Sequence, residues 1–100
     1  MAGPSTESEV LRRFYSQVEA VIDPVGVAKL LFEEGVLTED QLDEAELAST
    51  PPAEKRAAIL SAVRKVVRGN PKTLWVFIAA LEKFPGSATV AQKMREALSE

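Results

Sequence analysis

Apolar side chains recur along this chain at the three- and four-residue spacing of a helix face, in about six separate segments. No run of roughly four to eight residues alternates between apolar and polar positions, as a half-buried strand would. The pattern therefore predicts an all-helical protein. The apolar positions, segment by segment, are Leu11, Phe14, Val18 and Val21; Leu30, Leu31 and Phe32; Leu42 and Ala45; Ile59, Leu60, Val63, Val66 and Val67; Leu74, Phe77, Ile78, Leu81 and Phe84; and Val90, Ala91, Met94 and Leu98.

Small polar residues stand before each segment, where their side chains can accept hydrogen bonds from the free N–H groups of a first helical turn. Gln41, three residues after Thr38, completes a capping box for a helix that reaches about Leu47. Proline directly follows three of the caps, which is typical of a first helical position. The predicted caps are Ser5 or Thr6, Asp23, Thr38, Thr50 with Pro51, Asn70 with Pro71, and Ser87.

Glycine and proline predict where the helices end. Gly35 is expected in the left-handed conformation after the second helix, Gly69 closes the fourth, and Pro85-Gly86 interrupts the fifth. Because the connections are this short, we expect successive helices to pack as near-antiparallel neighbours around one core. The prediction is a single domain over residues 1–100, a six-helix antiparallel bundle with an ordered core at about 7–98. Disorder is expected only at residues 1–5 and the last one or two.

The composition removes several classes of function. With neither His nor Cys in the chain, a Ser or Cys triad, a thiolate metal site and a disulfide framework cannot be built. We therefore expect no enzyme, no cofactor and no metal site. The net charge of −3 gives no overall basic field for nucleic acid. The most apolar stretch, Leu74 to Leu81, is too short to span a bilayer, and no secretory signal begins the chain, so we expect a cytoplasmic protein.

Charged residues are sorted along the sequence. Acids gather in the second and third helices, where a solvated surface explains them better than carboxylate catalysis, and Trp75 is expected in packing. Bases gather in the first and fourth helices, with Lys65 and Arg68 pointing most directly outward. Separate acidic and basic faces can stack copies head to tail, although an ordinary mixed surface would also explain the pattern. The acids are Glu33, Glu34, Glu39, Asp40, Asp43, Glu44 and Glu46, and the bases are Arg12, Arg13, Lys55, Arg56, Arg64, Lys65 and Arg68.

A family resemblance favours the stacking interpretation. The run GVLTEDQLDEAEL from Gly35 to Leu47, the basic helix from Lys55 to Gly69, and the following TLWVFIAALEKF resemble the caspase recruitment domain (CARD), a branch of the death-fold superfamily. The likeness covers about residues 9–98 and depends on the order and spacing of all six helices. Members often have a first helix that bends into two parts, which the sequence does not decide.

The resemblance implies a six-helix bundle of the death-fold, Greek-key type. It also implies homotypic assembly with other CARD proteins, and with copies of itself, in apoptotic or inflammatory innate immune signalling. An acidic patch on the second and third helices would meet a basic patch on the first and fourth, without nucleic acid, membrane or small-molecule substrate. The predicted interaction residues are Arg12, Arg13, Lys55, Arg56 and Arg64 against Glu33, Glu34, Glu39, Asp40, Asp43 and Glu44.

Two other interpretations stay open. The first is a different death-fold module, namely a death, death-effector or pyrin domain. The second is a helix-turn-helix around GVLTEDQL that binds nucleic acid, against which the acids of that segment argue because they would repel phosphates.

Overall fold

Six α-helices make up the computed structural model, which describes residues 6–99. Within these residues no strand is present. The disorder predicted for the chain ends falls outside the described residues, apart from Ser99, which is helical. The helices are α1 (Glu7–Val21), α2 (Pro24–Glu33), α3 (Glu39–Glu46), α4 (Pro52–Gly69), α5 (Thr73–Glu82) and α6 (Pro85–Ser99).

Local caps set the starts of the first three helices, as predicted. The hydroxyl of Thr6 accepts from the backbone N–H of Glu9 at 3.2 Å, and the Glu9 carboxylate accepts from the Thr6 N–H at 3.2 Å. Thr38 forms the same reciprocal box with Gln41. The Asp23 side chain accepts from the N–H of the third residue of α2. The alternative cap Ser5 lies outside the described residues.

The other three predicted caps are wrong. Pro51 occupies the N-cap position of α4 and no side chain caps that helix, so Thr50 has no capping role. Asn70 ends α4, and a turn at residues 71–72 separates it from α5. Ser87 lies inside α6 and is fully buried, and its hydroxyl donates to the carbonyl oxygen of Leu81 at 2.8 Å. The hydroxyl is thus bonded to the end of the preceding helix, six residues earlier, and caps no helix start.

The predicted helix ends agree better with the structure. Gly35 has a φ of 78°, the left-handed conformation in which a Cβ would be strained, and it ends the α2 segment. Gly69 is the last residue of α4, and the break at Pro85 is present with proline as the first residue of α6. α1 is one unbroken helix of 15 residues, so it is not divided into two parts.

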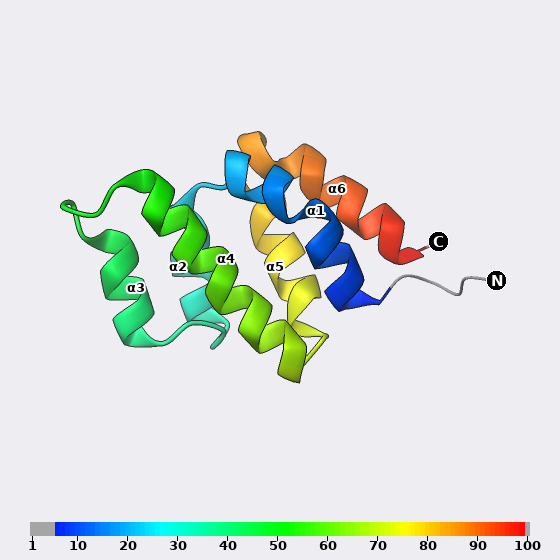
Figure 1. Ribbon diagram of the computed structural model, residues 1–100, viewed down its shortest axis with the longest axis horizontal. Helices are drawn as coiled ribbons and strands as arrows, with labels where there is room; N and C mark the ends of the chain where they lie inside the picture. The colour runs from blue at the N-terminus through cyan, green and yellow to red at the C-terminus, as the bar shows by residue number, and fades with distance from the viewer. Residues whose placement is uncertain (1–5, 100) are drawn as a thin grey trace.

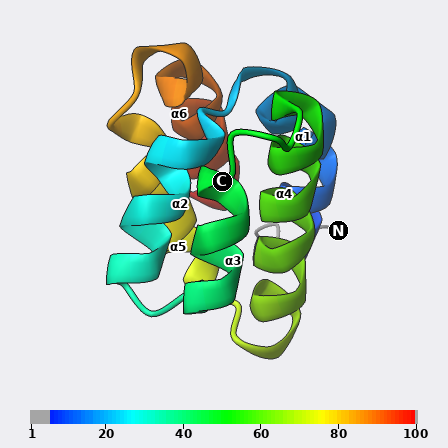
Figure 2. The ribbon, with the colours of Figure 1, turned by 90° about the vertical axis from the view of Figure 1, so that its left-hand side faces the viewer.

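Helix packing places α4 between α1 and α3 (Figure 1). α1 packs on α6 and α4, α6 packs on α5, and α2 packs on α3, α4 and α5. In Figure 2, α2 and α3 lie side by side, with α4 and α1 on the other side of the bundle. α1 and α2 are not a closely packed pair, which corrects the expectation that all successive helices pack together. The apolar face of α1 is already covered by α4 and α6.

Most of the predicted apolar stripes form the core. Leu11, Leu31, Leu60, Phe77 and Met94 are among the largest fully buried side chains. Two predicted core residues are instead substantially exposed, Val21 at 43% and Phe32 at 38%. Val10 and Ile22, which the stripe omitted, are buried. None of the described helices is both long and apolar enough to cross a membrane.

Candidate interaction surfaces

The predicted acidic residues all lie on the exposed side of α2 and α3 or on the turn between them. Glu33 and Glu34 border a depression of about 420 Å³ between α2 and α5. Glu44 faces the other way, into a groove between α3 and α4. Asp40 and Asp43 are exposed neighbours three residues apart on α3. The acids therefore surround α2 and α3 instead of forming one flat patch.

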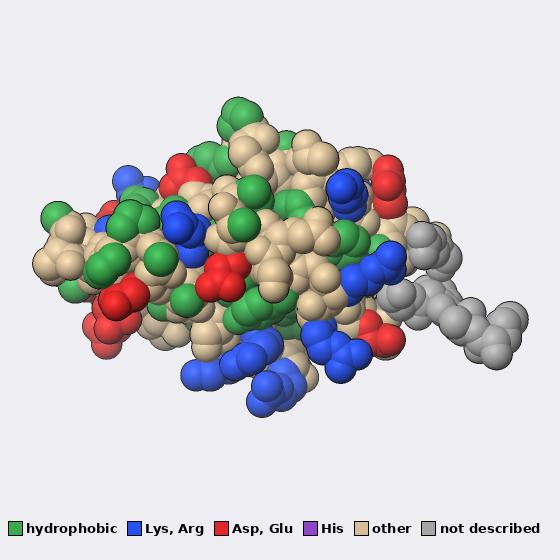
Figure 3. Space-filling view, turned by 45° about the horizontal axis from the view of Figure 1, so that its top comes forward, with side chains coloured by type: hydrophobic (Ala, Val, Ile, Leu, Met, Phe, Trp, Pro, Cys, Tyr) green, Lys and Arg blue, Asp and Glu red, His purple; other side chains and the backbone are tan. Residues whose placement is uncertain are grey.

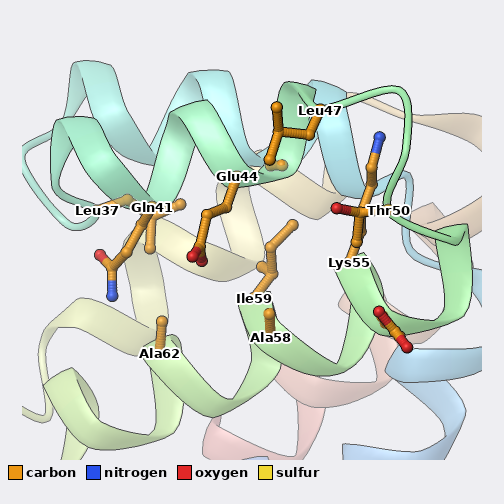
Figure 4. Close-up of a pocket in the computed structure, with 11 residues that line it drawn as sticks. Leu37, Gln41, Glu44, Leu47, Thr50, Lys55, Ala58, Ile59 and Ala62 are labelled. Atoms are coloured by element: carbon orange, nitrogen blue, oxygen red, sulfur yellow. The ribbon is translucent and has the colours of Figure 1, made fainter.

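The groove between α3 and α4 has a volume of about 360 Å³ and a mixed lining (Figure 4). Glu44 projects from α3 toward α4, while Lys55 projects from α4 toward the α3–α4 loop. Leu47, at the end of α3, is 50% exposed beside this groove, and Ile59 lies at its base. Lys55, predicted as part of the basic patch, thus shares a groove with the predicted acidic residue Glu44, and no residue of α1 lines that groove.

The remaining predicted bases lie at three separate places on α1 and α4. Arg12 and Arg64 line one depression of about 410 Å³ between these helices, and Arg68 lines it with them. Arg56 borders a separate shallow depression with Glu19 of α1. Arg13 is exposed, with its guanidinium carbon 5.4 Å from the centre of the Phe14 ring. Figure 3 shows Lys and Arg side chains gathered along one edge of the molecule.

Arg68 is not among the predicted interaction residues, although its helical position predicts that it points outward. The signal that could have found it is its spacing, because Arg64 and Arg68 are four residues apart and share one face of α4. The sequence does not show which helix packs against that face of α4. Only the packing of α1 on α4 places Arg12 beside the pair.

Few of the charges are neutralised within the molecule. Among residues 6–99, ion pairs within 4.0 Å join only Lys29 to Glu46 and Arg95 to Glu82. None of the predicted interaction residues takes part in either pair. Within the described residues, these charges are therefore screened by water and solvent ions alone.

Trp75 joins a polar cluster at the ends of α1, α5 and α6. It is 36% exposed, its indole N–H donates to a Glu7 carboxylate oxygen at 3.4 Å, and the Arg95 guanidinium lies 5.7 Å from its ring centre. Arg95 donates two hydrogen bonds to Glu82, at 2.7 and 2.9 Å. The hydrogen bonds with Glu82 raise the pKa of Arg95. Trp75 is partly exposed and packs under the Arg95 guanidinium, in line with its predicted place in packing.

One carboxylate has a shifted pKa because of its place in a cap. The backbone N–H and the hydroxyl of Thr6 both donate to Glu9, and these bonds, with a smaller contribution from the charge of Arg12, lower the Glu9 pKa.

Residues 6–99 contain no group of three or more acids placed to hold a metal ion.

Comparisons with known proteins identify no relative. No protein-family model matches the chain, and no match is found among curated proteins or solved structures.

Proposed function

We propose that this chain is a non-enzymatic interaction module of the CARD type, which assembles with other CARD domains and with copies of itself. The proposed contact joins the basic α1–α4 surface of one copy to the acidic α2–α3 surface of the next. The basic surface consists of Arg12, Arg13, Arg56 and Arg64, and the acidic surface of Glu33, Glu34, Glu39, Asp40 and Asp43. As part of this proposal the bundle has the death-fold, Greek-key arrangement and acts in the cytoplasm as an adaptor in apoptotic or inflammatory signalling.

The observation that carries the proposal is the absence of internal ion pairs at the predicted residues among residues 6–99. Exposed acids and bases of one chain that do not neutralise each other are free to do so between chains. The order of the six helices and the Gly35–Thr38 turn, on which the CARD resemblance depends, support the same conclusion.

The placement of the two surfaces favours head-to-tail assembly. α1 and α3 lie on opposite sides of α4, so the bases of α1 and the acids of α3 are on different flanks (Figure 1). A contact between two different surfaces leaves one of each free at the ends of every pair. Such a heterologous contact continues into a ring or a filament, whereas a symmetric pair would stop at two copies.

Two charge-reversal variants test this geometry together. Arg13→Glu reverses a charge on the basic surface, and Asp40→Lys reverses one on the acidic surface. Both positions are exposed, so the fold should tolerate the changes. Each variant alone should raise the concentration at which light scattering reports assembly by about tenfold or more, because like charges then face each other. Mixed together, they still share one intact contact, and the two reversed charges also attract each other, so the mixture should again assemble, at least into 1:1 pairs.

The matched controls are Lys93→Glu and Glu96→Lys, the same charge changes at exposed positions of α6. Both controls should assemble like the unchanged chain. Assembly unaffected in Arg13→Glu and in Asp40→Lys would refute the proposed contact. A mixture that forms no pair would refute its head-to-tail arrangement. A chain that stays monomeric at every concentration and does not bind any purified CARD domain would refute the function itself.

A further inference from the structure

The depression between α1 and α4 is built from two facing helical stripes. Ser8, Leu11, Arg12 and Tyr15 follow each other on one face of α1, and Arg64, Val67 and Arg68 follow each other on one face of α4. Leu11 and Val67 are almost fully buried and form an apolar floor. The three arginines and the two hydroxyl-bearing residues complete the lining, and the volume is about 410 Å³.

Positive charge is concentrated there, and none of the three arginines forms an ion pair within the described residues. Within residues 6–99, no carboxylate oxygen lies within 4.0 Å of a guanidinium nitrogen of Arg12, Arg64 or Arg68. The nearest acid along α1 is Glu9, one turn before Arg12, and its carboxylate already accepts two hydrogen bonds from Thr6. The lining itself contains no acid.

One of the three arginines, Arg64, has an aromatic contact that limits its side-chain freedom before any ligand arrives. The guanidinium carbon of Arg64 lies 6.0 Å from the centre of the Tyr15 ring, within the range of a cation–π contact. Tyr15 is itself half-buried, so this contact holds Arg64 over the depression. An arginine held in place loses less side-chain entropy when it binds a ligand than a free one does.

We infer that this depression is a binding site for a compact ligand carrying two or more clustered phosphoryl groups. Guanidinium groups bind phosphoryl oxygens with paired hydrogen bonds, and three of them around one small volume match a dense, multiply charged anion. The Ser8 and Tyr15 hydroxyls add donors to the same lining. This inference goes beyond the proposed assembly function and does not rest on it.

A purely structural role for the three arginines makes a different prediction. Like charges that are close together and have no counter-charge destabilise a fold, so a binding role predicts that Arg68→Gln leaves the melting temperature unchanged or raises it. A structural role predicts a lower melting temperature. The two roles are therefore separated by thermal unfolding without any ligand.

The binding experiment uses tripolyphosphate as the soluble probe, at a protein concentration where light scattering shows only monomer. Calorimetry and the NMR signals of Tyr15 and the arginine Nε–H groups report binding. The unchanged chain should bind, more weakly as salt rises. Arg12→Gln with Arg68→Gln should weaken binding by about tenfold or more, since each lost charge-assisted bond contributes on the order of tenfold. Lys65→Gln with Lys93→Gln, which removes the same charge outside the depression, should bind like the unchanged chain.

A second experiment distinguishes a free phosphate compound from a lipid headgroup as the ligand. Vesicles of phosphatidylcholine with and without phosphatidylinositol 4,5-bisphosphate are offered to the same three proteins. Binding of tripolyphosphate that needs Arg12 and Arg68 supports a soluble ligand, and binding only to the phosphorylated vesicles with the same requirement supports a headgroup. No binding to either probe, or equal loss in the Lys65 and Lys93 control, overturns the inference. Because assembly is absent in these conditions, neither result depends on the proposed function.

Discussion

Replacing Leu81 with alanine removes a fully buried side chain from α5 while leaving the backbone contacts of that residue in place. Leu81 is 0% exposed, and its carbonyl oxygen accepts hydrogen bonds from the Ser87 hydroxyl and from the Phe84 N–H. Alanine at this position keeps that carbonyl and therefore both bonds. The change isolates the contribution of the apolar side chain.

The expected loss follows from the burial. A fully buried leucine shortened to alanine costs about 2 to 5 kcal/mol, from the lost transfer free energy and the cavity left behind. A loss of about 3 kcal/mol is a fifth or more of the roughly 5 to 15 kcal/mol that stabilises an ordinary domain. For a chain of 100 residues it corresponds to a fall in melting temperature of about 12 to 24 °C.

Urea unfolding followed by the circular dichroism of the helices measures the change in free energy, and a thermal scan checks it. The matched control is Leu47→Ala, the same chemical change at a side chain that is 50% exposed. Its effect should be within about 0.5 kcal/mol of zero. Equal losses in the two variants, or a Leu81→Ala melting curve like that of the unchanged chain, would refute the assignment of Leu81 to the core.

Two further predictions concern local contacts. Gly26→Ala should lower the melting temperature although alanine favours helices, because its Cβ would lie 2.5 Å from the Phe84 Cζ, and it should become neutral or stabilising in a Phe84→Leu background. A higher melting temperature for Gly26→Ala alone would contradict this steric reading. The carboxyl of Glu9 should titrate below its ordinary value of 4.5, so the stability it gives α1 is present above that pH and is lost as the pH falls through the lower folded value. An NMR titration measures the midpoint, and a midpoint at or above 4.5 would show that the cap with Thr6 does not form.

The residues that could be predicted from the sequence are those whose partners are close along the chain. The capping box of Thr38 joins residues three apart, and the left-handed Gly35 satisfies the end of its own helix, so these signals do not depend on the rest of the fold. The same holds for the spacing that put Leu60, Phe77 and most other stripe residues in the core.

Prediction failed where a helix other than the residue's own decides its contacts. Ser87 is of a residue type that often caps helices, but its hydroxyl donates a hydrogen bond to the carbonyl oxygen of Leu81 across the α5–α6 junction. Val21 and Phe32 belong to predicted apolar stripes but are exposed, because the neighbouring helices do not cover them. A stripe gives the direction of a side chain, while its burial depends on which helix packs there.

The candidate surfaces divide in the same way. The sequence by itself determined which charges lie on the outer faces of the helices, because helical geometry fixes the direction of each side chain along its own axis. Only the tertiary structure decided which charges meet, separating Lys55 from Arg12 and bringing Arg12, Arg64 and Arg68 around one depression. The physical reason is that the pairing of helices depends on the burial of whole apolar faces, which no spacing within a single helix specifies.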